Sequence, residues 1–464
     1  AQKDSDWNLF DPSEFPELHE KYGQGFTREY NRAKKLAKEG KVKSYKVMSA
    51  KDLWKKILTS LYETGHPWIT FKDPSNIRYS NKHEGVVHSS NLCTEILLHT
   101  KPTKYDEGEV VEVGETAVCN LASINLENHI KVRTLDWKKL QETVEVAIRG
   151  LDNVIDINFY PTKEAKQSNL RHRPIGLGIM GTHGMLHSLG VSYDSKEAVE
   201  LCGKVQEFIS YYAILTSSKL AKERGVYESY EHSEWSYGNL PIDTYCRLIE
   251  HRGGDDSKAS SFETMEWDRV REHIALHGMR NSNVMAIAPT ATISYIQGCS
   301  QSIEPDYSVL FVYSTLSGEF TIINEHFVKM AKKKNIWCQQ LVDALKAADG
   351  DVMAIDLDEE IQQRFKSAFD VDSHTLISAA AERQKWIDMG QSFNLYNKGT
   401  SLKYLNDMYL DCWEQGLKTT YYLRSKSATR VEKSTVEEPE AQIEEDLSQV
   451  KACLITDPDC ESCQ

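Results

Sequence analysis

Segments with a helical apolar period alternate with short strand-like segments along most of the chain, and this alternation limits the fold more than any other feature. Ser49 followed by Asp52 is typical of a helix N-terminus, and Gly65 follows the apolar stripe, so we expect a helix between them. Apolar spacing predicts further helices over 140–155 and from a cap at Asp194 towards Gly225. The segments that indicate strands are 86–92, 116–126, 283–289 and 307–314. The alternation predicts a mixed α/β fold.

Charge and hydropathy exclude several classes of protein. The 55 basic and 69 acidic side chains give a formal charge of −14, which argues against binding to duplex nucleic acid or to an anionic membrane. No apolar run approaches the roughly 18 residues that a membrane span needs. The first ten residues lack the basic and apolar regions of a signal peptide, so we expect a cytoplasmic protein.

The composition changes after about residue 427. Residues 428–464 carry ten acidic and three basic side chains with little apolar surface, so we predict a partial catalytic unit over 1–427 and a flexible acidic tail over 428–464. Cys460 and Cys463 form a C-x-x-C in this tail, with Cys453 nearby. The tail lacks a fourth zinc ligand, so we predict no metal site; a mobile dithiol suits thiol–disulfide exchange instead.

A second group of reactive residues lies in Ser89–Ile96. If this segment is extended, Asn91, Cys93 and Glu95 project to one face, where one small substrate could touch an amide, a thiol and a carboxylate. The alternative is a half-buried strand with polar residues on its wet face, and the pattern by itself favours that alternative. Cys119, in a second strand-like segment, reads by itself as a core thiol.

Three other motifs are weaker when taken singly. Residues 176–181 match G-x-G-x-x-G, the motif of dinucleotide-binding proteins, in which it follows an apolar strand. Basic residues precede it here, so we interpret these glycines as allowing close helix packing. Residues 288–294 follow a strand-like segment and could present backbone N–H groups to an anion, or could simply cap a helix. Tyr421 and Tyr422 are adjacent phenols, a pattern usually due to strand packing.

Taken together and in order, NLCTE, AVCNLASINL, PTATIS followed by GCSQSIEP, TTYYL and the terminal CxxC resemble the large catalytic subunit of class I ribonucleoside-diphosphate reductase. The resemblance covers nearly the whole chain. It implies reduction of ribonucleoside diphosphates to deoxyribonucleotides, with Cys93 as the thiyl radical that abstracts the 3′ hydrogen. It further implies that Glu95 takes the 3′-hydroxyl proton and that Asn91 holds the sugar hydroxyls, beside Leu92 and Thr94.

The resemblance also implies roles for the other motifs. Cys119 is similar to one member of the reducing cysteine pair, and Tyr421 and Tyr422 to the last relay steps from a metal-containing, radical-generating small subunit. Cys460 and Cys463 resemble the shuttle that thioredoxin or glutaredoxin reduces. The loop that holds the substrate diphosphate is expected at Pro289, Thr290, Ala291, Thr292 and Ile293.

The implied fold is the second half of a ten-stranded α/β barrel with a central finger loop. The family's first reducing cysteine lies far upstream, yet no cysteine precedes Cys93 here. We therefore expect either part of a longer chain or a split-gene product that assembles with an N-terminal large-subunit fragment. No cofactor is expected within this chain. The competing hypothesis is a non-catalytic scaffold or a thiol–disulfide exchange module built on the terminal CxxC.

Overall fold

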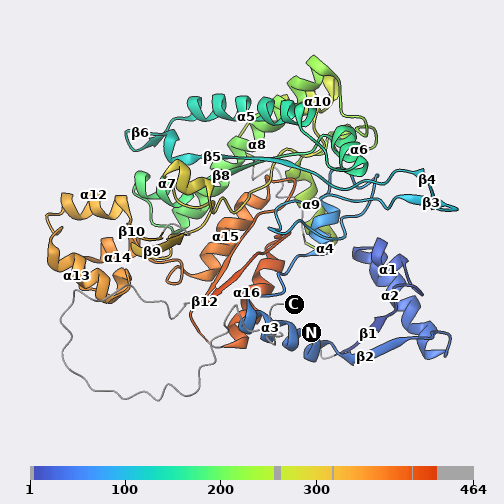
Figure 1. The fold of residues 1–464 in the computed structure, drawn as a ribbon, viewed down its shortest axis with the longest axis horizontal. Helices are drawn as coiled ribbons and strands as arrows, with labels where there is room; N and C mark the ends of the chain where they lie inside the picture. Colours follow the sequence, from blue (N-terminus) through green and yellow to red (C-terminus); the bar gives the residue numbers. More distant parts are fainter. Residues whose placement is uncertain (1–4, 255–262, 316–317, 400, 426–464) are drawn as a thin grey trace.

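A parallel array of extended segments lies at the centre of the computed structural model, which describes residues 5–254, 263–315, 318–399 and 401–425 (Figure 1). Strand β5 (Asn120–Asn125) pairs in parallel with β8 (Ile175–Met180). Residues 284–287 continue the array, because the Leu177 N–H donates to the Val284 carbonyl at 2.9 Å and a parallel bridge joins Leu177 to Met285. The mixed α/β fold is confirmed.

The array extends through the segment that begins at residue 389. The Ile287 N–H donates to the Gly390 carbonyl at 3.2 Å, and a parallel bridge joins Ile287 to Gln391. Further along the same segment, β11 (Leu395–Asn397) pairs in parallel with β12 (Leu423–Ser425). Within the described residues these segments form no closed barrel, so the implied half-barrel stays a prediction.

Helices cover this array, and short antiparallel pairs lie around it. In Figure 1, α5, α8 and α10 lie above β5 and β8, while α15 lies below them. The helices are α1 (Glu17–Glu20), α2 (Gly23–Lys38), α3 (Ala50–Thr64), α4 (Lys72–Ile77), α5 (Trp137–Ile157), α6 (Lys163–His172), α7 (Thr182–Leu189), α8 (Lys196–Arg224), α9 (Pro241–His251), α10 (Trp267–His277), α11 (Ile293–Gln297), α12 (Glu325–Lys333), α13 (Gln339–Ala347), α14 (Glu359–Arg364), α15 (Ser373–Gln384) and α16 (Leu402–Glu414). The antiparallel pairs are β1 (Asp6–Phe10) with β2 (Tyr45–Ser49), β3 (Lys104–Asp106) with β4 (Glu109–Glu112), β6 (Ile130–Lys131) with β7 (Thr134–Leu135), and β9 (Leu310–Thr315) with β10 (Gly318–Ile323).

The predicted helices form, with one correction. Ser49 caps α3 by accepting a hydrogen bond from the Asp52 N–H, and Gly65 ends the helix in the left-handed region at φ +72°. The stripe over 140–155 is the buried face of α5. The cap of α8 is Ser195 rather than Asp194: the Ser195 hydroxyl accepts from the Ala198 N–H, while Asp194 forms an ion pair with Lys366 at 2.7 Å.

The predicted strands form only in part. Segments 116–126 and 307–314 contain β5 and begin β9, and 283–289 joins the array through isolated bridges. The prediction for 86–92 is wrong, because those residues form a loop. The Asn76 side chain accepts from the Val87 N–H at 2.8 Å and donates to the Val87 carbonyl at 3.0 Å, so it takes the place of a neighbouring strand.

The interpretation of the 176–181 glycines also needs correction. Gly176 and Gly178 lie within β8 and allow strand contacts, not helix packing. A Cβ on Gly178 would lie 2.5 Å from the carbonyl oxygen of Ala286, so only glycine permits this approach of the neighbouring segment. Gly181 then begins α7 at φ +75°.

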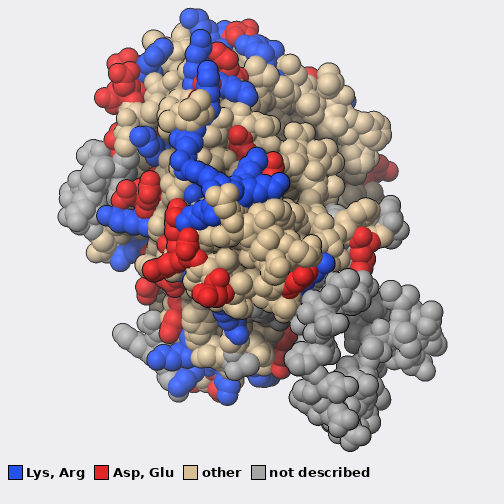
Figure 2. Space-filling view, turned by 90° about the vertical axis from the view of Figure 1, so that its left-hand side faces the viewer, with Lys and Arg blue, Asp and Glu red and all other residues tan. Residues whose placement is uncertain are grey.

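The charges of the surface are mixed in sign on the face seen in Figure 2. A branched band of Lys and Arg side chains crosses its upper half, with acidic side chains beside the lower end of the band (Figure 2). The net negative charge of the chain is therefore not spread evenly over this face. None of the helices in the described part of the chain is long and apolar enough to cross a bilayer.

One buried residue, Asp388, connects three segments, through its carboxylate and through its backbone carbonyl. Asp388 accepts hydrogen bonds from the backbone N–H groups of Val284 and Met285, each at 2.8 Å. Lys418 is fully buried and donates to the Asp388 carbonyl oxygen at 2.6 Å. Burial raises the pKa of Asp388 to about 6 despite these hydrogen bonds.

Asp388→Ala leaves two buried N–H groups without an acceptor. We expect it to lower the free energy of unfolding by about 3 kcal/mol in urea titrations. The matched control is Asp356→Ala on an exposed aspartate, which should change stability by no more than about 0.5 kcal/mol. Equal effects of the two substitutions would contradict the role of Asp388 in the array.

Candidate functional site

The segment around Cys93 is a tight loop rather than the extended strand that we considered from the sequence. The Ile96 N–H donates to Asn91 Oδ1 at 3.0 Å, and the Thr94 N–H donates to the Asn91 carbonyl at 3.2 Å. Thr94 has φ +69°, an unfavourable value for a β-branched residue. The three residues therefore do not alternate along a strand: the Asn91 side-chain oxygen closes the loop, and Leu92 is exposed at its tip.

Cys93 and Glu95 are held together by residues distant in the sequence. Ser392 Oγ donates to the Cys93 carbonyl oxygen at 2.5 Å and lies 3.2 Å from Glu95 Oε2. The Gly390 N–H donates to the Glu95 carbonyl oxygen at 2.8 Å. Glu95 is buried and Cys93 is partly accessible, and the Ser392 hydroxyl connects the Glu95 carboxylate with the Cys93 backbone.

The two adjacent tyrosines reach this thiol. Tyr421 donates its phenol hydrogen to Cys93 Sγ at 3.4 Å. Its ring centroid lies 4.2 Å from that of Tyr422, and the Trp68 ring packs against both, 4.8 Å from Tyr421 and 5.2 Å from Tyr422. Burial, then the hydrogen bonds to Cys93 and Tyr422, raise the pKa of Tyr421. Tyr421 is therefore a neutral phenol in direct contact with the Cys93 sulfur.

Cys119 lies one residue before β5, and the carboxylates of Glu95 and Asp388 influence its thiol. Burial raises the pKa of its thiol well above the ordinary value, and the negative charges of Asp388 and Glu95 add to the shift. Its sulfur packs near Gly176 of the neighbouring strand. A thiol kept neutral in this way is better suited to giving a hydrogen atom than to attacking as a thiolate.

The predicted anion loop leads into a short helix, as expected from its small and hydroxylated residues. Thr290 has φ +51°, and its Oγ1 accepts from the Ser302 N–H at 2.8 Å. Ala291, Thr292 and Ile293 are exposed, and α11 begins at Ile293. Pro289 is partly buried at the end of segment 284–287. Binding of a diphosphate by this loop stays a prediction.

The remaining candidates lie outside the described residues. These are Cys460 and Cys463, together with the neighbouring Cys453 and the tail over 428–464. Their role in thiol–disulfide exchange and the division of the chain at residue 427 remain predictions.

Sequence reasoning missed Glu304 and Ser392. Tyr396 donates its phenol hydrogen to Glu304 Oε2 at 2.6 Å, and the Asn394 N–H donates to Oε1 at 3.3 Å. Asn394 Oδ1 in turn accepts from the Tyr422 N–H, so this network positions the tyrosine pair. Burial raises the pKa of Glu304 to about 7. Glu304 lies in the SIEP motif that contributes to the family resemblance, so the sequence offered a signal for it. No sequence pattern connects Ser392 with Cys93, 299 positions earlier.

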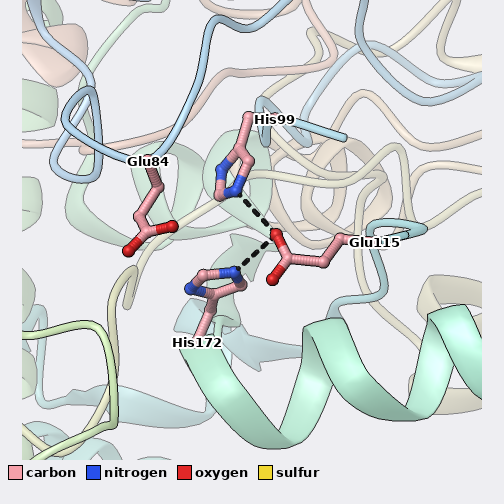
Figure 3. A group of neighbouring side chains, drawn as sticks. All are labelled: Glu84, His99, Glu115 and His172. Carbon is pink, nitrogen blue, oxygen red and sulfur yellow. Dashed lines mark hydrogen bonds and ion pairs between the residues drawn. The ribbon is translucent and has the colours of Figure 1, made fainter. Parts of the chain in front are cut away.

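A second polar cluster contains Glu84, His99, Glu115 and His172, the last residue of α6 (Figure 3). Glu115 Oε2 accepts from Nε2 of both His99 and His172, each at 3.1 Å. Arg171 donates to both Glu115 and Glu84, at 2.8 Å. Burial alone would raise the pKa of Glu115, but the hydrogen bonds from these two histidines and Arg171 hold it well below its usual range.

This cluster reads as a charge-balanced network rather than as a metal site. Lys101 adds a second cation, 2.6 Å from Glu84 and 3.6 Å from Glu115. His99 Nδ1 contacts the Tyr79 hydroxyl at 2.8 Å and His172 Nδ1 contacts Ser229 Oγ at 2.5 Å, so all four ring nitrogens have partners. Two cations already neutralise the two carboxylates, and a metal ion would have to bind beside them.

A known protein family matches most of the chain. The family model described as "Ribonucleotide reductase, barrel domain" matches residues 1–423. The chain belongs to this family. The resemblance noted from NLCTE and the later motifs is thereby confirmed at the level of the family.

Named relatives agree as well. The chain is 52% identical over 437 residues to the ribonucleoside-diphosphate reductase subunit alpha of Chlamydia muridarum, covering 94% of this chain and 41% of that protein. It is 38% identical over 489 residues to the corresponding subunit of Helicobacter pylori, covering 94% of this chain and 56% of that one. The large subunit of Caenorhabditis elegans is 35% identical over 440 residues, with 94% and 52% covered. The chain thus spans about half the length of these relatives.

The contact of Gly390 with the Cys93 loop generates a stability prediction. A Cβ at position 390 would lie 2.7 Å from the Thr94 carbonyl oxygen and 2.8 Å from Thr419 Oγ1, so Gly390→Ala must displace the loop. We expect a loss of about 2 kcal/mol in urea unfolding, typical of overpacking. We also expect faster alkylation of Cys93, followed by mass spectrometry.

The matched control is Gly150→Ala on the exposed side of α5, where a Cβ meets nothing within 4 Å. This substitution should stabilise the protein by about 0.5 to 1 kcal/mol and leave Cys93 alkylation unchanged. An unchanged rate of Cys93 alkylation in Gly390→Ala would show that Gly390 does not hold the loop.

The raised pKa of Glu304 predicts a pH dependence of stability. Between the ordinary pKa of glutamate and the folded value of about 7, the folded state binds more protons than the unfolded state, so stability falls as pH rises through this window. Glu304→Gln removes this dependence. The difference in unfolding free energy between wild type and Glu304→Gln should change by about 3 kcal/mol between pH 4.5 and pH 7.5, to the disadvantage of wild type at high pH. A constant difference would contradict the shift.

Proposed function

We propose that this chain forms the substrate-reducing part of a ribonucleoside-diphosphate reductase, in which Cys93 acts as a thiyl radical. The observation that carries the proposal is the hydrogen bond from the Tyr421 hydroxyl to Cys93 Sγ, with the Tyr422 ring directly behind it. A phenol can lose an electron and a proton together, so this arrangement offers a path by which the thiol loses a hydrogen atom to a tyrosyl radical. In this proposal the radical arrives from a partner through the tyrosine pair, which directly precedes β12.

The neighbouring residues supply the acid–base part of the reaction. After the Cys93 radical takes the 3′ hydrogen atom of the substrate, the Glu95 carboxylate is placed to accept the proton of the 3′-hydroxyl. The Ser392 hydroxyl donates to the Cys93 backbone carbonyl and contacts the Glu95 carboxylate, so it positions both residues. Asn91 has its side-chain oxygen committed to the loop, which leaves its amide NH₂ to hold the sugar hydroxyls.

Reducing equivalents balance the reaction. Removal of the 2′-hydroxyl as water consumes two thiol hydrogens and leaves one disulfide. Cys119 is the thiol of this pair that the chain contains, and the rest of the catalytic subunit, on this polypeptide or on a separate N-terminal one, supplies the other. Cys460 and Cys463 then reduce the disulfide by exchange, and thioredoxin or glutaredoxin reduces them. Pro289 to Ile293 hold the substrate diphosphate.

The radical originates outside this chain. We propose that a metal-containing small subunit oxidises Tyr422 first, since the Tyr422 ring is more accessible than Tyr421 and the Arg424 guanidinium stacks over it at 4.3 Å. The chain itself needs no cofactor for this reaction. Its other partners are the ribonucleoside diphosphate and the remaining part of the large subunit.

The test uses the complex reconstituted with the small subunit and the remainder of the large subunit. Cys93→Ser and Tyr421→Phe should each lower nucleotide reduction by at least about a hundredfold, because each removes the group that passes the hydrogen atom. The measurement is formation of deoxyribonucleoside diphosphate from a labelled ribonucleoside diphosphate.

Matched controls separate chemistry from folding. Cys338→Ser at the exposed N-terminus of α13 and Tyr404→Phe on the exposed side of α16 should leave the rate unchanged. Reduction that survives Cys93→Ser would overturn the mechanism. If the wild-type complex reduces no nucleotide while disulfide exchange by the tail persists, the chain is the thiol-exchange module of the competing hypothesis.

A further inference from the structure

Two histidines on α7 and one aspartate form a cluster that the proposed reaction does not use. His183 and His187 are four residues apart, so they lie on the same face of the helix, and their ring centroids are 4.0 Å apart. Asp306 comes from the segment before β9. Its Oδ2 lies 3.4 Å from His183 Nδ1 and 3.9 Å from His187 Nε2.

His187 is unusual because it is buried without a hydrogen-bond partner. Its side chain is 1% exposed, and within the described residues neither ring nitrogen makes a hydrogen bond. Leaving buried polar atoms in this state costs about 1 to 3 kcal/mol. Both ring nitrogens of His187 are therefore open to a ligand that the hydrogen bonds of the described residues do not supply.

We propose that His183, His187 and Asp306 bind a divalent first-row transition metal ion, with zinc as the best match. Two imidazoles and one carboxylate are a known type of ligand set for Zn²⁺ with an open fourth position. Ligands of a tetrahedral zinc ion lie ~3.3 Å apart; the separation of 3.4 Å from Asp306 Oδ2 to His183 Nδ1 matches this value, and the 3.9 Å to His187 Nε2 is longer. One ligand atom from each of the three residues lies within 4.8 Å of the other two, so small side-chain rotations complete the site.

The surroundings suit a cation better than those of the cluster in Figure 3. His183 Nδ1 accepts the Asp306 N–H at 2.9 Å, and metal binding exchanges this hydrogen bond for a bond to the ion. Asp306 and His326 line a cavity of about 290 Å³ that also contains Glu127. A water molecule or His326 can supply the fourth ligand from this side. Two cations lie within 4 Å of the carboxylates at the Glu84–Glu115 cluster, whereas Asp306 Oδ2 accepts a hydrogen bond from the uncharged Asn324 amide.

The test is metal binding by the full chain carrying Cys460→Ser and Cys463→Ser, so that the terminal dithiol does not compete. The chain is dialysed against a zinc solution and then against metal-free buffer. Inductively coupled plasma mass spectrometry should then find one Zn²⁺ per chain. Co²⁺ in its place should give the intense visible absorption of a tetrahedral site with nitrogen and oxygen ligands. Zinc should raise the melting temperature, because it binds the folded state.

Substitutions locate the ion. Asp306→Asn, which keeps the size of the side chain, and His187→Leu should each weaken zinc binding by at least about tenfold, measured by competition with a chromophoric chelator. The melting temperature of Asp306→Asn should no longer respond to zinc. Circular dichroism of Asp306→Asn without metal shows whether the variant is folded.

Two matched controls come from other histidines. His277→Asn alters the other i, i+4 histidine pair, on α10, and His99→Gln alters the cluster of Figure 3. Both should retain zinc affinity. Absence of stoichiometric metal, or binding that survives both Asp306→Asn and His187→Leu, would overturn the proposal. Loss of zinc in His99→Gln alone would place the ion at the Glu84–Glu115 cluster and would overturn it equally.

Discussion

The close approach of Gly390 to the Cys93 loop is the contact on which the candidate site depends. The Gly390 N–H binds the Glu95 carbonyl oxygen, and no side chain fits between the two backbones. Gly390 belongs to the segment that pairs with 284–287 and leads into β11, so the loop is fastened to the parallel array at the centre of the fold. Ser392, two residues further on, then contacts both Cys93 and Glu95. The radical role proposed for Cys93 would benefit from such fixed surroundings, because they limit what the sulfur can contact.

Burial of charge follows the same array. Asp388, Glu304 and Lys418 are buried, and each makes hydrogen bonds that connect neighbouring segments. Burial raises the pKa of both carboxyls and so reduces the charge that the interior must hold at moderately acidic pH. Glu115 shows the opposite solution, since Arg171 and two histidines surround it and keep it ionised. The polar groups thus connect neighbouring segments by hydrogen bonds in addition to the apolar packing.

Local sequence patterns predicted what local forces determine. The caps of α3 and the apolar stripes of α3 and α5 needed no tertiary information, and the resemblance carried by NLCTE led to the correct family. The loop at Cys93 was not predictable from alternation, because the Asn91 side chain replaces a strand partner and Thr94 adopts a positive φ. The strand prediction for 86–92 is wrong for a related reason, because the Asn76 side chain makes the hydrogen bond to the Val87 N–H that a neighbouring strand would make. Ser392 and Gly390 could not be found at all, as their roles arise only when distant segments meet.

The α7 cluster and the predicted diphosphate loop are joined by a short series of hydrogen bonds. The Thr182 N–H donates to the Ser302 carbonyl at 3.3 Å, and the Ser302 N–H donates to Thr290 Oγ1 at 2.8 Å. Both α7 and the loop follow the carboxyl ends of adjacent members of the array, β8 and 284–287. In open α/β sheets this is the edge at which ligands bind. An ion held by His183, His187 and Asp306 would fix the segment from Ser302 to Asp306 against α7, and that segment carries the hydrogen bond that holds Thr290. The proposed metal site would therefore act on the predicted diphosphate loop through position, without direct contact with a diphosphate.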